Sequence, residues 1–131
     1  MTGFQTPLWV SIDDDSQPRP IMTLLAAFKY RDEQLGDIAI PIGFRFDGAS
    51  IPTPAMGLIG WPGVRAACVH DYLLTTTVPR EEADACFGRA LEHCNVPATT
   101  AFLMHEAVCA YTQELRRQEQ VASLPDEYKG A

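Results

Sequence analysis

The chain has 131 residues, 47% of them hydrophobic, and a formal net charge of −7 at pH 7. This length predicts a single domain, residues 1–131, with one core, and the composition is ordinary for a globular protein. The acidic balance disfavours binding to nucleic-acid backbones and to anionic membranes. Because the start lacks the pattern of a secretory signal and no apolar run is long enough for a transmembrane segment, we expect synthesis in the cytoplasm.

The first half of the chain is predicted to be extended. Residues 1–20 are expected to form an N-terminal arm and loop, and residues 21–46 to hold the strands. Within the latter, 22–30 and 37–46 show partial alternation around a polar connector, which predicts a β-hairpin or small antiparallel sheet. Pro41 indicates an edge or bulged strand. The aromatic residues Trp9, Phe28 and Phe44 are expected in the core rather than on a base-stacking surface.

Residues 47–63 are rich in proline and glycine and therefore predict a long loop. Long ordered loops in compact domains are usually functional, so this segment is expected to be a functional loop.

Three helical patterns fill residues 64–120, and the tail 123–131 is expected to fray. The helices are predicted at about 64–74, 79–94 and 97–120. The fold class is therefore α+β, with a hairpin or small antiparallel sheet, a long loop, and a three-helix core containing an antiparallel helix pair.

The four cysteines are Cys68, Cys86, Cys94 and Cys109, all within predicted helices. None belongs to a CxxC pair, so a structural zinc site is not expected. Free thiols in the core are favoured over two disulfides in a cytoplasmic protein.

Asp84 is the most informative residue, because it shares the apolar stripe of the second helix with Phe87 and Leu91. A carboxylate that faces a core requires a partner. Arg80, one turn earlier, is the local alternative. Gly88 leaves space for another helix to approach this face.

His70, on the preceding helix, is the second candidate partner of Asp84. A carboxylate that accepts a proton from one imidazole nitrogen leaves the other nitrogen as a base. The alternative is a core histidine that merely satisfies a buried aspartate. His105 and Thr112 share the stripe of the third helix with Phe102, and we expect His105 to be a hydrogen-bonded core residue rather than a further ligand.

Asp71 points about 100° away from His70 on its helix, towards the loop that carries Asp47. Two carboxylates and loop carbonyls are typical oxygen ligands of Ca²⁺. The alternative for Asp47 is a turn aspartate in an Asp-Gly dipeptide. Together with a His–Asp pair, these residues predict a base beside a cation, which could polarise an ester or amide carbonyl.

Three spaced motifs resemble an uncharacterised domain family that is common in phage and prophage genomes. The motifs are FRFDGASIP at 44–52, AACVHDYLL at 66–74 and PREEADACF at 79–87. The resemblance covers residues 38–111, with Leu74 in place of a tyrosine and Phe46 in place of a threonine.

A more distant resemblance is to bacterial and fungal secreted phospholipase A2. It implies that His70 is the general base and Asp84 its orienting carboxylate. It also implies that Asp47 and Asp71 are calcium ligands and that the Gly48 region offers a backbone carbonyl.

The sequence departs from the phospholipase A2 pattern at two positions. Ala49 stands where that family has a disulfide cysteine, and Cys68 lies one place nearer the His-Asp pair than expected. The disulfide that clamps the loop in that family is therefore not expected here.

Two main hypotheses follow. The first is a phage or prophage protein with a calcium-assisted hydrolase site for a lipid or other ester. The second is a non-catalytic virion or tail component, bound to phage structural proteins, that keeps the motif as a buried polar network. A weaker third idea, suggested only by the acidic surface, is an inhibitor of host defence. In each case the chain would be made in the host cytoplasm, with virion association under the second hypothesis.

Overall fold

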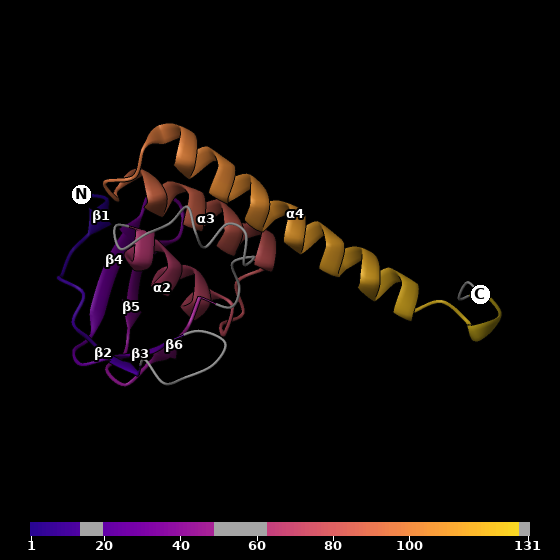
Figure 1. Ribbon diagram of the computed structural model, residues 1–131, viewed down its shortest axis with the longest axis horizontal. Coiled ribbons are helices and arrows are strands. Elements are labelled where there is room, and N and C mark those ends of the chain that lie inside the picture. The colour runs from indigo at the N-terminus through magenta and orange to yellow at the C-terminus, as the bar shows by residue number, and fades with distance from the viewer. Residues whose placement is uncertain (14–19, 49–62, 129–131) are drawn as a thin grey trace.

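The computed structural model describes residues 1–13, 20–48 and 63–128 (Figure 1). The elements in chain order are β1 (Gly3–Phe4), β2 (Val10–Asp13), β3 (Ile21–Leu24), β4 (Phe28–Asp32), β5 (Gly36–Ile40), β6 (Arg45–Phe46), α2 (Val64–Leu73), α3 (Arg80–Glu92), α4 (Ala98–Ala122) and the 3-10 helix η2 (Asp126–Tyr128). Small antiparallel sheets followed by three helices confirm the predicted α+β class.

The strands form two three-stranded antiparallel sheets, in the orders β1-β4-β5 and β2-β3-β6. This differs from the expected division, because the segment 1–20 contributes β1 and β2, and the single predicted strand 22–30 is divided between the two sheets. The division falls at residues 25–27, just after the Leu25 N–H donates to the Trp9 carbonyl at 2.8 Å beside the last pair of β2 and β3. Pro41 follows the last residue of β5, where it costs no hydrogen bond of the sheet.

Buried and exposed side chains alternate along β4, so one face of the first sheet is turned towards the helices. Phe28, Tyr30 and Asp32 are buried, whereas Lys29 and Arg31 between them are exposed. The inward side chains of both sheets form one hydrophobic cluster with α2 and α3. Its large, fully buried members include Leu24, Phe28, Tyr30, Ile40, Phe87 and Leu91.

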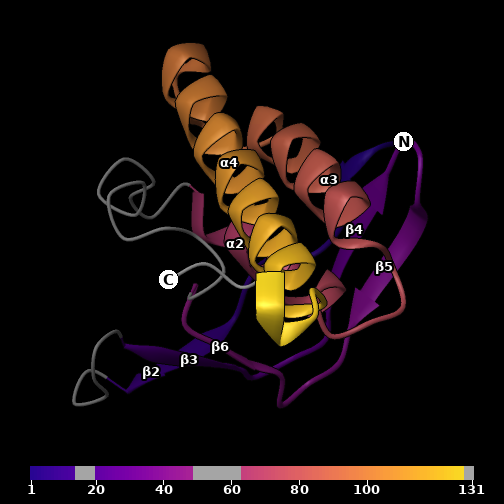
Figure 2. The same ribbon diagram turned by 90° about the vertical axis from the view of Figure 1, so that its right-hand side faces the viewer.

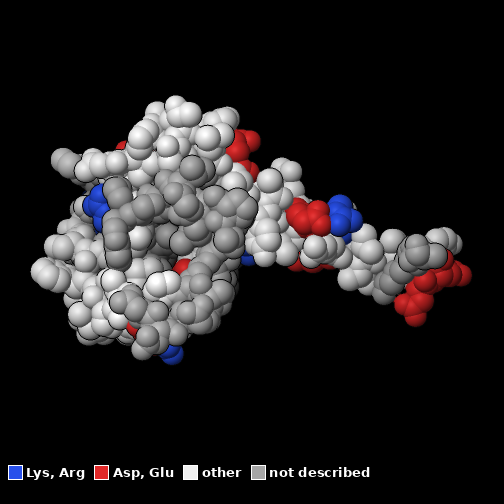
Figure 3. All heavy atoms as spheres, viewed as in Figure 1, with Lys and Arg blue, Asp and Glu red and all other residues white. Residues whose placement is uncertain are grey.

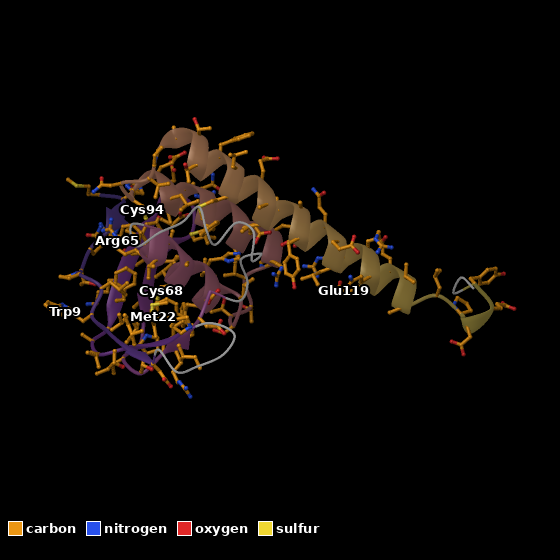
Figure 4. All side chains as sticks on the ribbon, in the orientation of Figure 1. Trp9, Met22, Arg65, Cys68, Cys94 and Glu119 are labelled. Carbon is orange, nitrogen blue, oxygen red and sulfur yellow. The ribbon has the colours of Figure 1, made fainter. Side chains whose placement is uncertain are left out.

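Not every aromatic residue belongs to this core. Phe28 is buried and Phe44 is half-buried, as expected. The expectation for Trp9 was wrong, because its side chain points outward from the edge of the molecule (Figure 4) and is 61% exposed. Trp9 lies just before β2, on a stretch whose residues are mostly exposed.

A buried ion pair ties the first sheet to α3. Arg89 donates through Nε and Nη2 to the two carboxylate oxygens of Asp32, at 3.0 and 2.9 Å. The backbone N–H groups of Gln34 and Leu35 also donate to Asp32. Burial would raise the pKa of this carboxyl, but Arg89 and the two backbone donors outweigh it and lower the pKa to about 2.

The three helices pack in sequence, with α3 in contact with both α2 and α4 (Figure 2). α2 also contacts β5 and β6, and α3 contacts β4. Pro79 precedes α3, and Glu81 and Glu82 lie in its first turn, where acidic side chains stabilise the helix dipole. The short connection between α2 and α3 places the last turn of one helix beside the first turns of the next.

α4 continues well beyond the other elements (Figure 1). Its buried residues are Met104, Val108 and Thr112, which are spaced four apart. The projecting part carries charged side chains (Figure 3), among them the Arg116–Glu119 pair at 3.1 Å. No helix of residues 1–13, 20–48 and 63–128 has the length and apolar character needed to cross a membrane.

The cysteines are free thiols, as predicted. Cys68, Cys86 and Cys94 are buried and Cys109 is half-buried. Burial is the main reason why the pKa of each thiol is raised, to about 12 for Cys86.

Candidate active site

The structure brings together the two residues at the centre of the predicted site. His70 on α2 and Asp84 on α3 meet across the helix pair, with 2.7 Å between Nε2 and Oδ1. Their side chains are 0% and 2% exposed. Phe87, one turn after Asp84, packs on the imidazole with 5.1 Å between the ring centroids. The apolar stripe that predicted a buried Asp84 therefore also supplies the surface that orients His70.

The contact specifies the state of the imidazole. An ionised carboxylate only accepts hydrogen bonds, so with Asp84 ionised the contact assigns the proton that faces it to Nε2 of His70. In the neutral ring, Nδ1 then holds the lone pair. Asp84 also stabilises the imidazolium that forms when Nδ1 takes up a proton. Both properties are needed in a histidine general base, which must also be reached by water and substrate.

A third member of the network comes from α4. The Thr112 hydroxyl contacts the second carboxylate oxygen of Asp84, with 2.5 Å between Oγ1 and Oδ2. Arg80 donates from Nε to the same hydroxyl at 3.0 Å. Of the two candidate partners of Asp84, His70 contacts it directly, whereas Arg80 donates to Thr112 and reaches Asp84 only through that hydroxyl.

The role of Thr112 was missed in the sequence, although a signal was present. Thr112 continues the buried row of Met104 and Val108 as its only hydroxyl-bearing member. A polar side chain on a buried helical stripe needs a partner, just as Asp84 does. The same argument applied to the third helix would have selected it.

Asp71 contacts the start of the predicted functional loop. The Gly48 N–H donates to Oδ2 of Asp71 at 3.0 Å. Gly48 has a φ of +74°, a left-handed conformation that glycine adopts without strain. Asp71 thus lies on the side of α2 that was expected, with Asp47, which is half-buried, next to its partner in the chain. Residues 49–62 of that loop lie outside the described residues.

The described residues fit a calcium ion only in part. Asp47 and Asp71 offer carboxylates of the kind that Ca²⁺ prefers, but six to eight oxygens usually complete its shell. Within residues 1–13, 20–48 and 63–128, no group of three or more His, Cys, Asp or Glu side chains is arranged to hold a metal ion. Gly48 presents its N–H to Asp71, whereas the resemblance implied a ligating carbonyl.

His105 lies outside the His70–Asp84 contact and packs against α3. A Cβ added at Gly88 would meet the His105 ring at 3.0 Å, so the glycine does provide the space that was predicted. His105 is half-buried, and its Nε2 is buried without a hydrogen-bond partner among the described residues, which contradicts the expected hydrogen-bonded core histidine. The stripe expectation was also wrong for Phe102, which is 62% exposed.

A groove of about 320 Å³ lies between the first turns of α3 and the second half of α4. Asp84 and Thr112 line its inner part, and Glu81 and Arg116 line it further out. Arg116 and Glu81 form an ion pair across it, with 2.9 Å between Nη2 and Oε1. The groove places the Thr112 side of the network next to a space that water can enter.

Comparison with known proteins gives a family but no activity. Residues 22–108 match the family described as "Protein of unknown function (DUF1353)". A relative in Sinorhizobium fredii, strain NBRC 101917 / NGR234, is named "Uncharacterized protein y4jT" and is 31% identical over 102 residues. The alignment covers 74% of this chain and 30% of the relative, so the chain spans about a third of that protein's length. No solved structure matches the chain.

Proposed function

We propose that this chain, which belongs to the DUF1353 family of proteins of unknown function, is a hydrolase that activates water against an ester through His70 and Asp84. The observation that carries the proposal is the 2.7 Å contact between Nε2 of His70 and Oδ1 of Asp84. A buried carboxylate is costly, and this one is held against an imidazole in the arrangement of a base and its orienting group. The distant resemblance to phospholipase A2 supports the same roles.

In the proposed reaction, Nδ1 of His70 removes a proton from water as the water oxygen forms a bond to the ester carbonyl carbon. Asp84 stabilises the imidazolium through the Nε2–H hydrogen bond. The bond to the alkoxy oxygen then breaks, and the imidazolium returns its proton to the leaving alcohol. The products are a carboxylic acid and an alcohol, and the enzyme ends in its starting state.

Calcium is proposed as an accessory ligand of Asp47 and Asp71, on the resemblance and the two carboxylates. When bound, a hard cation at this position would polarise the carbonyl of a substrate. Any ion that binds the folded chain more tightly than the unfolded chain raises the melting temperature. We therefore expect calcium chloride to raise the melting temperature of the wild type relative to EDTA, and to have no such effect on Asp71→Asn.

The hydrolase proposal is tested with purified His70→Gln and the matched control His93→Gln, because His93 is an exposed histidine on the neighbouring helix end. Glutamine can still donate to Asp84, so the fold should persist while the base is lost. Turnover of p-nitrophenyl butyrate and of phosphatidylcholine vesicles is measured. We expect activity in the wild type and in His93→Gln, and a loss of at least about a hundredfold in His70→Gln.

One observation favours a second candidate, in which the network is non-catalytic; the resemblance to a phage family would then make the chain a virion or tail component. His70 is 0% exposed, and a base must be reached by water and substrate. In this case the network serves stability, and neither wild type nor variants turn over any ester. His70→Ala and Asp84→Ala would instead lower the free energy of unfolding by about 3 to 5 kcal/mol, because one buried partner loses the other. Urea denaturation read alongside the turnover assay separates the two candidates.

A further inference from the structure

The two oxygens of Asp84 have different partners from different helices. Oδ1 accepts from His70 on α2, and Oδ2 accepts from the Thr112 hydroxyl on α4. We infer that Thr112 is a positioning residue of this site, held in its donating orientation by Arg80, an inference that rests on the proposed hydrolase function. Thr112 acts through Asp84.

Contacts at both oxygens fix the rotation of the carboxylate. With a single partner at Oδ1, the group could turn about its Cβ–Cγ bond and move that oxygen away from the imidazole. The contact from α4 opposes this rotation, because Thr112 is 3% exposed and is held on a buried helical row. The hydroxyl thereby keeps Oδ1 aligned with Nε2 of His70, which keeps the proton on Nε2 and the lone pair on Nδ1.

Arg80 determines which way the hydroxyl points. A threonine hydroxyl can donate or accept, whereas a guanidinium can only donate. Because Nε of Arg80 donates to Oγ1 of Thr112 at 3.0 Å, the hydroxyl proton is left for Asp84. The stacking of Arg80 against the Tyr111 ring, with 5.6 Å between Cζ and the ring centroid, helps to hold the guanidinium in place. The chain of donors therefore runs in one direction, from Arg80 through Thr112 to Asp84.

The groove between α3 and α4 explains why Asp84 needs the Thr112 hydroxyl as a second partner. Thr112 and Asp84 both line this groove, yet Asp84 is only 2% exposed. Without the hydroxyl, Oδ2 would be left unpaired or would take water as a mobile partner, and either state weakens the alignment of Oδ1. Thr112 also lies beyond residue 108, where the family match ends, so membership of the family does not itself assign it.

The test uses Thr112→Val, which keeps the shape and removes the hydroxyl, Thr112→Ser, which keeps the hydroxyl, and Thr99→Val as control. Thr99 is exposed in the first turn of the same helix. The first readout is the ring ¹⁵N and ¹H resonances of His70, assigned among the three histidines with single His→Gln variants. The second is kcat and KM for p-nitrophenyl butyrate.

We expect Thr112→Val to shift the His70 ring resonances away from the pure Nε2–H form and to speed exchange of that proton about tenfold. We also expect kcat to fall about tenfold with KM unchanged, since Thr112 is proposed to act through Asp84 rather than on the substrate. Thr112→Ser should restore both readouts, Arg80→Met should move them in the direction of Thr112→Val, and Thr99→Val should leave them unchanged.

The inference is overturned if the His70 resonances of Thr112→Val match those of the wild type, or if Thr112→Ser behaves like Thr112→Val. A fall in melting temperature without these changes would mean that Thr112 is structural only. The ring resonances do not depend on turnover, so they also separate the two proposals. If the wild type hydrolyses no ester but its His70 resonances respond to Thr112→Val, the positioning role stands and the hydrolase proposal fails.

Discussion

Removing the charge of Asp32 tests the buried pair that joins the first sheet to α3. Asp32→Asn keeps the size of the side chain and one acceptor oxygen for the N–H groups of Gln34 and Leu35. It removes the negative charge that Arg89 contacts at 2.9 Å. The side chains of Arg89 and Asp32 are 17% and 0% exposed, so solvent screens this pair weakly.

The magnitude follows from the pKa of Asp32, which falls from its ordinary 3.8 to about 2 in the folded chain. One pKa unit corresponds to about 1.4 kcal/mol, so ionisation of Asp32 stabilises the folded state by about 2 kcal/mol. Because the folded pKa is the lower one, this stabilisation is complete above pH 4 to 5 and is lost as the pH falls towards 2. The total cost of Asp32→Asn at neutral pH is expected to be about 3 kcal/mol, since Arg89 also loses its partner.

The assay is urea denaturation of the wild type and Asp32→Asn from pH 7 to pH 2. The difference in unfolding free energy should be constant from pH 7 to 5 and should shrink by about 2 kcal/mol towards pH 2. Asp37→Asn is the matched control, because the Arg31–Asp37 pair is exposed and should contribute little. A difference that does not vary with pH would refute the assigned cause, and so would a control that changes as much as Asp32→Asn.

Two further predictions concern packing. Gly88→Ala should destabilise the fold less in a His105→Ala background than in the wild type, because the new Cβ would meet the imidazole at 3.0 Å. A double-mutant cycle of unfolding free energies in urea should give a coupling of at least about 0.5 kcal/mol, and additive effects would contradict the contact. The four thiols should react slowly with Ellman's reagent at pH 8 in the folded protein, since burial raises the pKa of each of them. Half-buried Cys109 should react first, and all four should react rapidly in urea. Fast reaction of Cys68 in the native state would be inconsistent with its burial.

The helical half of the fold was predictable because its information is local. The pattern predicted a helix at about 64–74, and α2 spans Val64–Leu73. Asp84 interrupts an apolar stripe, and a buried carboxylate requires a partner, for which the sequence offered Arg80 on the same helix and His70 on the preceding one. The short connection between α2 and α3 left His70 as a residue within reach, and the structure places it there.

The strands and the Asp32–Arg89 pair were harder to predict from the sequence, because they depend on contacts between residues that are distant in the chain. Asp32 was read as part of a polar connector, since its neighbours are typical of turns. It does accept turn hydrogen bonds, but it also pairs with Arg89, 57 residues away. The alternation of Phe28, Tyr30 and Asp32 on the buried face was the available signal. Which strands share a sheet depends on the packing of the whole chain, so no local pattern separated β3 from β4.

Because α4 projects beyond the rest of the molecule, only part of this helix contributes to the site. Thr112 is the last buried residue along α4, and the residues that follow are held mainly by surface ion pairs. Trimming the helix back to Arg116 would remove exposed turns and the outer wall of the groove but keep Thr112, whereas trimming it before Thr112 would take away the hydroxyl that contacts Asp84. The minimal unit that retains the complete network therefore ends within one turn of Thr112, some way short of where the helix itself stops.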